Sequence, residues 1–367
     1  MPFAIRSLIL ALALMGCVHR VPEPHPEHLR VRLDQMQFIG THNAYHIEPD
    51  AALRVVWQRS AAAGERSHET LMYTHLPLSA QATLGIRFFE LDVHLDPEGG
   101  RYSADGFLAP MRDVGLAPDA PFDADGRLLL PGTKVFHTLT DMRSTCLLLV
   151  ECLAELGAWL DENPEAGPVI IQIEPKDLLD NDGDGLRSWA ALESDLLAAV
   201  PEQRMYRPED LAERPDQLRA AALAGRWPRF AALRGQFIFV LNGSAADTQS
   251  YASALAAGRT HLMFPALSDA QAPLAAFVSR NDPAAADIAE LAASGQVVIT
   301  YADWRTDPAR RNDTRGRDAA FASGAQLIAT DYPIPDRRLS DYTVRFEDGF
   351  IRRRPMPLPV EQRPESR

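Results

Sequence analysis

The stretch Gly85-Ile-Arg-Phe-Phe-Glu-Leu-Asp-Val-His94 has the pattern of a β-strand that ends in acidic residues. Side chains alternate between the two faces of a strand, which puts Glu90, Asp92 and His94 on one face and the apolar residues between them on the other. Two carboxylates at close range raise each other's pKa unless a cation lies between them. A divalent metal ion is the simplest explanation for this pair, and an exposed polar strand face is the alternative.

Seven more short apolar runs have the composition of buried strands, and helical patterns separate several of them. The predicted strands are residues 36–41, 86–94, 134–138, 169–174, 237–241, 262–265, 296–301 and 326–330. The predicted helices include residues 78–84, 147–162, 186–200, 283–294 and 315–323. This alternation predicts an α/β fold: a TIM-type barrel of seven to eight strands that forms a single catalytic domain.

Polar residues capable of chemistry stand at the C-terminal ends of these predicted strands. In chain order they are His42, Asn43, Glu90, Asp92, His137, Glu174, Lys176, Asp331 and Tyr332. The C-terminal ends of barrel strands converge on one rim, where active sites are built. The convergence predicts an enzyme.

Four of these residues offer hard oxygen ligands, namely Asn43, Glu90, Asp92 and Glu174. Such ligands select calcium or magnesium over zinc or copper, and calcium's larger coordination number leaves room for water and a substrate oxygen. The alternative is that one of the carboxylates forms a salt bridge with Lys176 or Arg87. His42 and His137 complete the set, because an imidazole can give or take a proton near neutral pH.

Five motifs together resemble the bacterial calcium-dependent phosphoinositide-specific phospholipase C family. They are Phe38-Ile-Gly-Thr-His-Asn-Ala-Tyr-His46, Leu76-Pro-Leu-Ser-Ala-Gln-Ala-Thr-Leu-Gly-Ile-Arg-Phe-Phe-Glu-Leu-Asp92, Val135-Phe-His137, Ile171-Gln-Ile-Glu-Pro-Lys176 and Gly324-Ala-Gln-Leu-Ile-Ala-Thr-Asp-Tyr-Pro333. The resemblance covers roughly residues 35–335. It implies a TIM-type barrel that cleaves the glycerol side of a phosphodiester. Calcium is the implied cofactor, with magnesium the less favoured ion, and its implied ligands are Asn43, Glu90, Asp92 and Glu174.

The resemblance also implies a mechanism in which the inositol 2-hydroxyl attacks phosphorus, diacylglycerol leaves and a cyclic inositol phosphate forms. His42, His137 and Glu174 are then the expected catalytic residues, and Lys176, Arg305 and Tyr332 are candidate substrate contacts. One departure bears on the head group: Tyr301 stands where an anion-binding arginine is expected. A second is the long segment 96–131, which is either a lid over the rim or a disordered insertion.

Two other readings stay open at this point. Glycerophosphodiester phosphodiesterases use a similar set of residues, but an arginine and a glycine characteristically follow their first histidine, where this chain has Asn43 and Ala44. A protein of another class, a non-catalytic lipoprotein that binds lipid head groups, would not need all six core positions intact.

The N-terminal residues predict export and anchoring. Residues 1–16 have a basic start and an apolar run too short to span a membrane, and the sequence Leu14-Met-Gly-Cys17 resembles a bacterial lipobox. We therefore expect a lipoprotein signal peptide over 1–16, a lipidated Cys17, a proline-rich tether over 17–32, the catalytic barrel over 33–345 and a basic, proline-rich tail over 346–367. The expected location is the bacterial cell envelope, with the protein attached to a membrane through Cys17.

The overall charge of −13 gives the chain no general attraction to nucleic acid. The expected partner is a phospholipid or another phosphodiester substrate, and no protein partner is predicted.

Two local features are ambiguous. Cys146 and Cys152 can form a disulfide only if Cys146 precedes the following helix, because six helical residues rise about 9 Å. The run Asp180-Asn-Asp-Gly-Asp-Gly185 matches the first half of an EF-hand loop, but Ala191 replaces the final glutamate. It is either a second calcium site or a solvated acidic turn.

Overall fold

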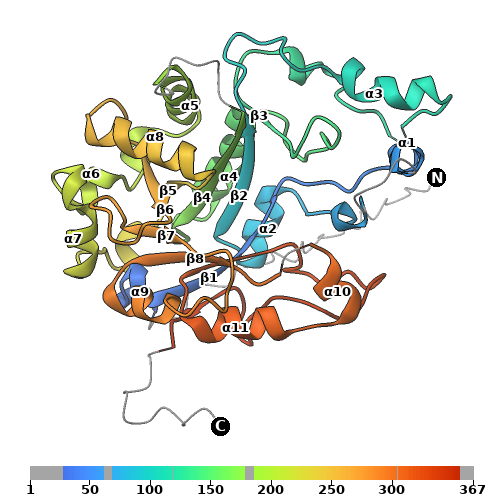
Figure 1. The fold of residues 1–367 in the computed structure, drawn as a ribbon. Helices are drawn as coiled ribbons and strands as arrows, with labels where there is room; N and C mark the ends of the chain where they lie inside the picture. Colours follow the sequence, from blue (N-terminus) through green and yellow to red (C-terminus); the bar gives the residue numbers. More distant parts are fainter. Residues whose placement is uncertain (1–27, 62–67, 119, 178–185, 304, 356–367) are drawn as a thin grey trace, which may run out of the picture.

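Eight parallel strands close into a barrel in the computed structural model, which describes residues 28–61, 68–118, 120–177, 186–303 and 305–355. The sheet order is β10-β1-β9-β8-β7-β6-β5-β4-β2-β3, and β1 also pairs with β2 to close the ring (Figure 1). The strands are β1 Met36–Thr41, β2 Phe88–His94, β3 Lys134–Val135, β4 Val169–Asp177, β5 Phe237–Leu241, β6 Met263–Leu267, β7 Phe277–Ser279, β8 Val297–Tyr301, β9 Leu327–Thr330 and β10 Ile351–Arg353.

Helices surround the barrel. They are α1 Ala51–Ala61, α2 Leu78–Leu84, α3 Ala104–Asp113, α4 Leu149–Glu162, α5 Leu186–Ala199, α6 Pro208–Leu211, α7 Leu218–Leu223, α8 Ala245–Ala256, α9 Ile288–Ser294, α10 Asp307–Arg311 and α11 Arg315–Ser323. The 3₁₀ turns are η1 His28–Arg30, η2 Leu33–Gln35, η3 His68–Leu71, η4 Arg127–Leu129, η5 Glu202–Arg204, η6 Pro215–Gln217 and η7 Phe230–Leu233. Helix α4 shows why they pack: its buried residues, which include Leu149, Leu153, Leu156 and Leu160, recur every three or four positions.

The prediction of a TIM-type barrel is confirmed, but one strand was assigned wrongly. The predicted third strand is β3, which is only two residues long, pairs antiparallel with β2 and lies outside the parallel ring. The place in the ring is filled by β7, a three-residue strand that the sequence pattern missed. The count of eight was therefore right for a partly wrong reason.

The barrel closes through a short seam between β1 and β2. Only Gly40 and Thr41 of β1 pair with β2, opposite Phe88 and Phe89. A Cβ atom added to Gly40 would lie 2.3 Å from Cδ1 of Phe88, so the close approach of the two strands requires glycine.

The described residues of segment 96–131 include the helical elements α3 and η4, so they are not a disordered insertion, and none of them lines the cavity described below. Helix α3 packs against α1 beside the barrel (Figure 1). Phe107 and Met111 of α3 form a second apolar cluster with Trp57 of α1 and Leu128 of η4.

The two predicted extensions of the barrel are partly described. Residues 28–32, the end of the predicted tether, pack against the barrel through the partly buried Leu29 and Val31. The predicted basic tail contributes a strand: β10 pairs antiparallel with β1 along residues 36–38. The predicted signal peptide, Cys17, the EF-hand-like run 180–185 and residues 356–367 lie outside the described residues.

Cys146 precedes α4 and forms a disulfide with Cys152, with 5.4 Å between the two Cα atoms. The condition derived from the sequence is thus met.

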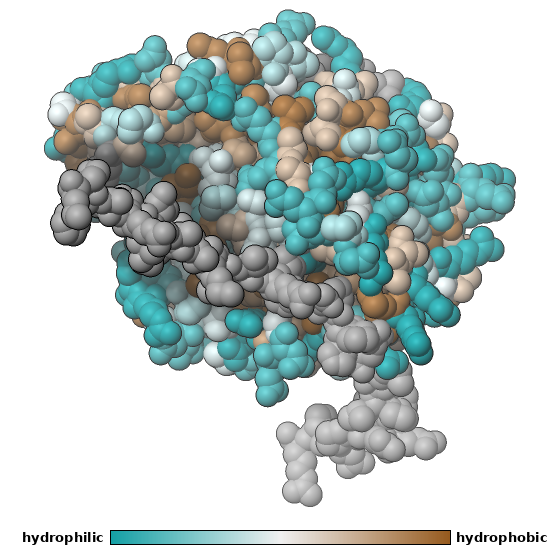
Figure 2. Space-filling view, turned by 180° about the vertical axis from the view of Figure 1, so that it is seen from behind, coloured by the Kyte–Doolittle hydropathy of each residue, from teal (hydrophilic) through white to brown (hydrophobic). Residues whose placement is uncertain are grey.

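On the face shown in Figure 2, hydrophobic residues are scattered among hydrophilic ones. Within the described part of the chain, no helix is long and apolar enough to cross a membrane.

Candidate active site

Three carboxylates come together on two neighbouring strands. Glu90 and Asp92 lie on β2, and Glu174 lies on β4 directly opposite Asp92 in the parallel register. Their ligand oxygens all lie within 4.8 Å of one another. Glu90 and Asp92 are buried, whereas the side chain of Glu174 is 29% exposed. We call these three residues the carboxylate cluster.

The carboxylate cluster has the properties of a cation site. Burial and the neighbouring charge of Asp92 raise the pKa of Glu90 well above its usual value. Glu90 Oε2 accepts a hydrogen bond of 2.6 Å from the backbone N–H of Asn43, but the other oxygen, Oε1, is buried with no hydrogen-bond partner among the described residues. A hard divalent cation would satisfy this oxygen, and all the donors at the cluster are oxygens. The residues therefore fit calcium.

Asn43, the predicted amide ligand, lies at the start of the turn that follows β1. Its backbone has a left-handed φ of 47°, which Asn tolerates better than most residues. Its Nδ2 donates to Tyr73 Oη at 2.8 Å, and its Oδ1 accepts from Tyr45 Oη at 3.2 Å. An amide oxygen has two lone pairs, so Oδ1 retains one for a metal ion.

Lys176 contacts the carboxylate cluster directly. Its Nζ lies 2.6 Å from Glu174 Oε1 and 3.0 Å from Asp92 Oδ1. The salt bridge considered from the sequence is thus present for Lys176. It is absent for Arg87 among the described residues, since that guanidinium donates to the carbonyls of Ala82 and Ile86 and stacks on Trp159. Lys176, a candidate substrate contact, therefore forms ion pairs with Asp92 and Glu174 in this structure.

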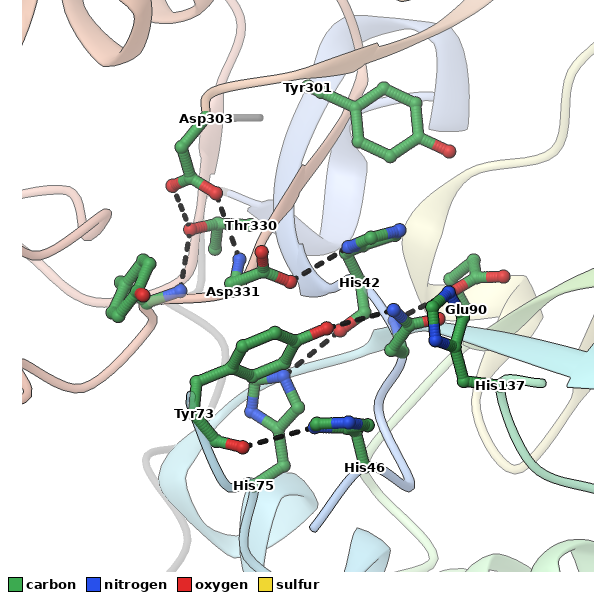
Figure 3. A network of polar contacts seen from close by, with 12 residues as sticks. His42, His46, Tyr73, His75, Glu90, His137, Tyr301, Asp303, Thr330 and Asp331 are labelled. Carbon is green, nitrogen blue, oxygen red and sulfur yellow. Dashed lines mark hydrogen bonds and ion pairs between the residues drawn. The ribbon is translucent and has the colours of Figure 1, made fainter. Parts of the chain in front are cut away.

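His42 is paired with a carboxylate from the far end of the chain. Its Nδ1 lies 2.7 Å from Oδ1 of Asp331, which follows β9, next to β1 in the sheet (Figure 3). Burial acts to lower the pKa of His42, but Asp331, with Glu90 and Asp92 as further contributors, raises the pKa to about 10. His42 is consequently an imidazolium at neutral pH.

Asp331 is itself held by Asp303, which follows β8. Asp303 accepts hydrogen bonds from the Asp331 backbone N–H at 3.0 Å and from Thr330 Oγ1 at 2.5 Å. Burial and the charge of Asp331 raise the pKa of Asp303 to about 7.

His137 is paired with a carboxylate of its own turn. Its Nδ1 lies 3.0 Å from Oδ2 of Asp141, which leaves Nε2 as the nitrogen that can meet a substrate. The same Oδ2 lies 3.0 Å from Nε2 of the fully buried His46. Burial acts to raise the pKa of Asp141, but the two histidines lower it to about 2.

A cavity of about 730 Å³ brings most of the predicted site residues together. Its walls include His42, Asn43, His137, Glu174, Lys176 and Arg305, and also Tyr301, Asp303 and Asp331. Glu90 and Asp92 are buried behind this surface. Tyr332 does not line the cavity, because its side chain is buried against Tyr73 and Tyr342. Tyr301 and Tyr73 do line the cavity, and Tyr301 is in edge contact with His42.

The sequence alone does not reveal the residues that position the histidines. Asp331 stands out only as a strand-end residue, and His46 only as part of a motif. Asp141 carried no signal except its spacing of four residues from His137.

The fold and the site together define a TIM-barrel enzyme that has two carboxylate-paired histidines beside a cation-type carboxylate cluster. Residues 31–355 match the sequence model of the family described as phosphoinositide phospholipase C, Ca²⁺-dependent. The chain belongs to this family.

Solved structures with the same fold support the architecture. A calcium-dependent phosphoinositol-specific phospholipase C from a Pseudomonas species, in its apo form and myo-inositol complex, is similar with a TM-score of 0.57 and 14% identity, over 90% of this chain and 97% of the other. A crystal form of the apo enzyme from the same source gives a TM-score of 0.56 and 14% identity over the same shares. No curated protein sequence gives a significant match.

Proposed function

We propose that this protein is a calcium-dependent phosphodiesterase that cleaves phosphatidylinositol-type lipids into diacylglycerol and a cyclic inositol phosphate. The observation that carries the proposal is the cavity in which His42 and His137 face the same space as the carboxylate Glu174. Asn43, Glu90, Asp92 and Glu174 would hold the calcium ion. When bound, calcium would lower the pKa of the attacking hydroxyl and stabilise charge on the phosphoryl oxygens.

The chain's own residues have distinct roles in the proposed reaction. The inositol 2-hydroxyl oxygen forms a bond to phosphorus while its proton passes to the Glu174 carboxylate. The imidazolium of His42, fixed by Asp331, stabilises the negative charge that develops on the phosphoryl oxygens. His137 gives its Nε2 proton to the glycerol oxygen as the bond between that oxygen and phosphorus breaks.

The head group is the least specified part of the substrate. Tyr301 fills the position of the expected anion-binding arginine and receives a hydrogen bond of 3.2 Å from Gln172 Nε2. Arg305 lines the cavity and is the remaining candidate for contacts to phosphate or inositol phosphate.

The decisive assay measures product release from phosphatidylinositol and from glycerophosphoinositol by the purified protein, with calcium, magnesium or a chelator present. We expect cleavage of phosphatidylinositol in calcium, loss of activity in chelator, and a fall of about 10²–10⁴ in turnover for His42→Ala. Cleavage of the deacylated substrate alone would instead indicate a glycerophosphodiester phosphodiesterase. Unchanged turnover in His42→Ala would show that the catalytic assignment is wrong.

We further propose that the protein is anchored in the bacterial cell envelope through a diacylated Cys17. The support is the lipobox-like sequence and the proline-rich residues that follow it. Mass spectrometry of the membrane fraction should find the acylated cysteine, and Cys17→Ser should release the protein from that fraction. A soluble wild-type protein that carries no lipid would rule the anchor out.

A further inference from the structure

Lys176 occupies an irregular place in the barrel that directs its side chain into the carboxylate cluster. On β2, Val93 and His94 are neighbours, but they pair with Pro175 and Asp177 of β4. Lys176 is the extra residue between these partners, and such a bulge changes the direction in which a side chain points. Its ammonium reaches Glu174 at 2.6 Å and Asp92 at 3.0 Å, with 27% of the side chain exposed.

The charges at this place are unbalanced without Lys176. Glu90, Asp92 and Glu174 can carry three negative charges, and Lys176 is the cation that forms ion pairs with them among the described residues. A lysine ammonium is charged at neutral pH, and carboxylate oxygens of Asp92 and Glu174 within 3.0 Å of Nζ stabilise that charge.

The ammonium and a calcium ion compete for the same place. Calcium binds carboxylate oxygens at about 2.3–2.6 Å, so an ion held by both Asp92 and Glu174 needs the space between them. Nζ of Lys176 now bridges these two side chains. The two cations also repel each other, so they cannot share the site.

We propose that Lys176 is an exchangeable counter-ion of the carboxylate cluster: it neutralises Asp92 and Glu174 in the calcium-free protein and leaves them when calcium binds. This inference rests on the calcium site of the proposed function. Because Lys176 also lines the cavity, the displaced ammonium stays in the wall that faces the substrate. Calcium binding thus adds positive charge to the place where an anionic phosphodiester would bind.

The test is the calcium affinity of the purified protein without substrate, measured by titration calorimetry for wild type and Lys176→Met. We expect Lys176→Met to bind calcium on the order of tenfold more tightly, equivalent to about 1.4 kcal/mol. Its calcium-free form should melt at a lower temperature, and calcium should raise its melting temperature more than that of wild type. Lys176→Arg, which keeps the charge, should bind calcium much as wild type does.

Arg280→Met is the matched control, because it also removes one positive charge from the cavity wall. Arg280 pairs with Asp287 at 2.8 Å and forms no ion pair with the carboxylate cluster among the described residues. Its calcium affinity should stay close to that of wild type. Equal tightening in both Met variants would reduce the effect to general charge, and unchanged or weaker binding in Lys176→Met would also overturn the inference.

The same measurements separate this inference from the proposed function. If wild type and Lys176→Met bind calcium equally well, only the counter-ion role fails. If neither folded variant binds calcium, both the counter-ion role and the calcium site fail. Circular dichroism of the calcium-free proteins establishes that the variants are folded.

Discussion

Two histidines of the same cavity have different carboxylate environments. His42 has Asp331 as its close carboxylate partner, whereas His137 shares Asp141 with His46. The ring nitrogens of His46 lie 3.0 Å from the Tyr73 carbonyl and 3.0 Å from Asp141, and both partners are acceptors. His46 must therefore be doubly protonated, and its charge already balances that of Asp141. His42 is thus suited to a constant positive charge and His137 to proton transfer.

The charge of His42 should depend on Asp331. The pKa of His42 is raised to about 10, so its imidazolium persists until the pH rises through that value. In Asp331→Asn the pKa falls, and the charge should be lost at lower pH. The ion pair's contribution to stability, complete below about pH 6.5 and lost as the pH rises towards 10, should also disappear.

The measurement is the pH dependence of kcat, together with the free energy of unfolding between pH 6 and 10. We expect the alkaline limb of the kcat profile to move to lower pH in Asp331→Asn. An alkaline limb in the same place for both proteins would mean that this pair does not control the charge of His42.

Asp141 should matter for stability as well as for activity. Its pKa is lowered to about 2, so its contribution is present above about pH 4 and is lost as the pH falls to about 2. Asp141→Asn leaves the buried imidazolium of His46 without its counter-ion. We expect a loss of about 3 kcal/mol in the free energy of unfolding at pH 7 and reduced turnover. Denaturant unfolding checks this, with the exposed Asp105→Asn as control; equal stability of the two variants would contradict it.

The elements that hold the site could be predicted to different degrees. Strands β1 and β5 have the predicted bounds, because each is a short apolar run between polar residues. Strand β7 could not be found, since three residues are too few to show alternation, and its place is fixed by pairing with β6 and β8. The run 134–138 looked like a barrel strand because periodicity does not reveal whether a strand joins its neighbour parallel or antiparallel.

The site residues also divide into those with a local sequence pattern and those brought together only by the fold. Glu90, Asp92 and Glu174 could be predicted because they stand on the strands themselves, at positions set by alternation. The pairing of His42 with Asp331 joins residues 289 positions apart, and only the adjacency of β1 and β9 creates it. Asp141 is close in sequence to His137, but its backbone pairing with Thr138 and its contact with the buried His46 set its position. Contacts that depend on tertiary structure leave no local pattern.

The disulfide should stabilise the start of α4 without taking part in catalysis. It joins Cys146, in the chain before the helix, to Cys152, the fourth residue of the helix. Closing so short a loop is worth about 2 kcal/mol by its effect on the unfolded chain. The Cys146→Ser, Cys152→Ser double variant should lose about that much stability and keep its turnover at temperatures where it is folded. Thermal melts and the assay of product release from phosphatidylinositol test this. A large loss of turnover in the folded variant would contradict it.

At the scale of the whole molecule, residues near the C-terminus pack against the first strand of the barrel. Strand β10 pairs with β1, and the preceding Phe346 and Phe350 are buried. Arg352 lies 4.0 Å from the ring centroid of Phe346 and donates to Gln37 Oε1 at 2.8 Å. The predicted tail is therefore part of the fold up to at least residue 353.

Truncation measures how much the described residues of this tail contribute to stability. Ending the chain after Gly349 removes the buried Phe350 and β10, and should lower the free energy of unfolding by about 3 kcal/mol or more. Ending it after Pro355 should leave stability within about 0.5 kcal/mol of the full chain. Denaturant unfolding of the two shortened proteins measures the difference, and comparable losses in both would show that β10 contributes little.

The short seam of the barrel has a consequence for how this chain can vary. His42 and Asn43 directly follow the β1 side of the seam, and Glu90 follows the β2 side, so the two halves of the candidate active site meet across two residue pairs. A methyl group at residue 40 would clash with Phe88 and push the two strands apart. We therefore expect substitutions to be tolerated as poorly at Gly40 as at His42 and His137, although a glycine has no side chain that could contact a substrate.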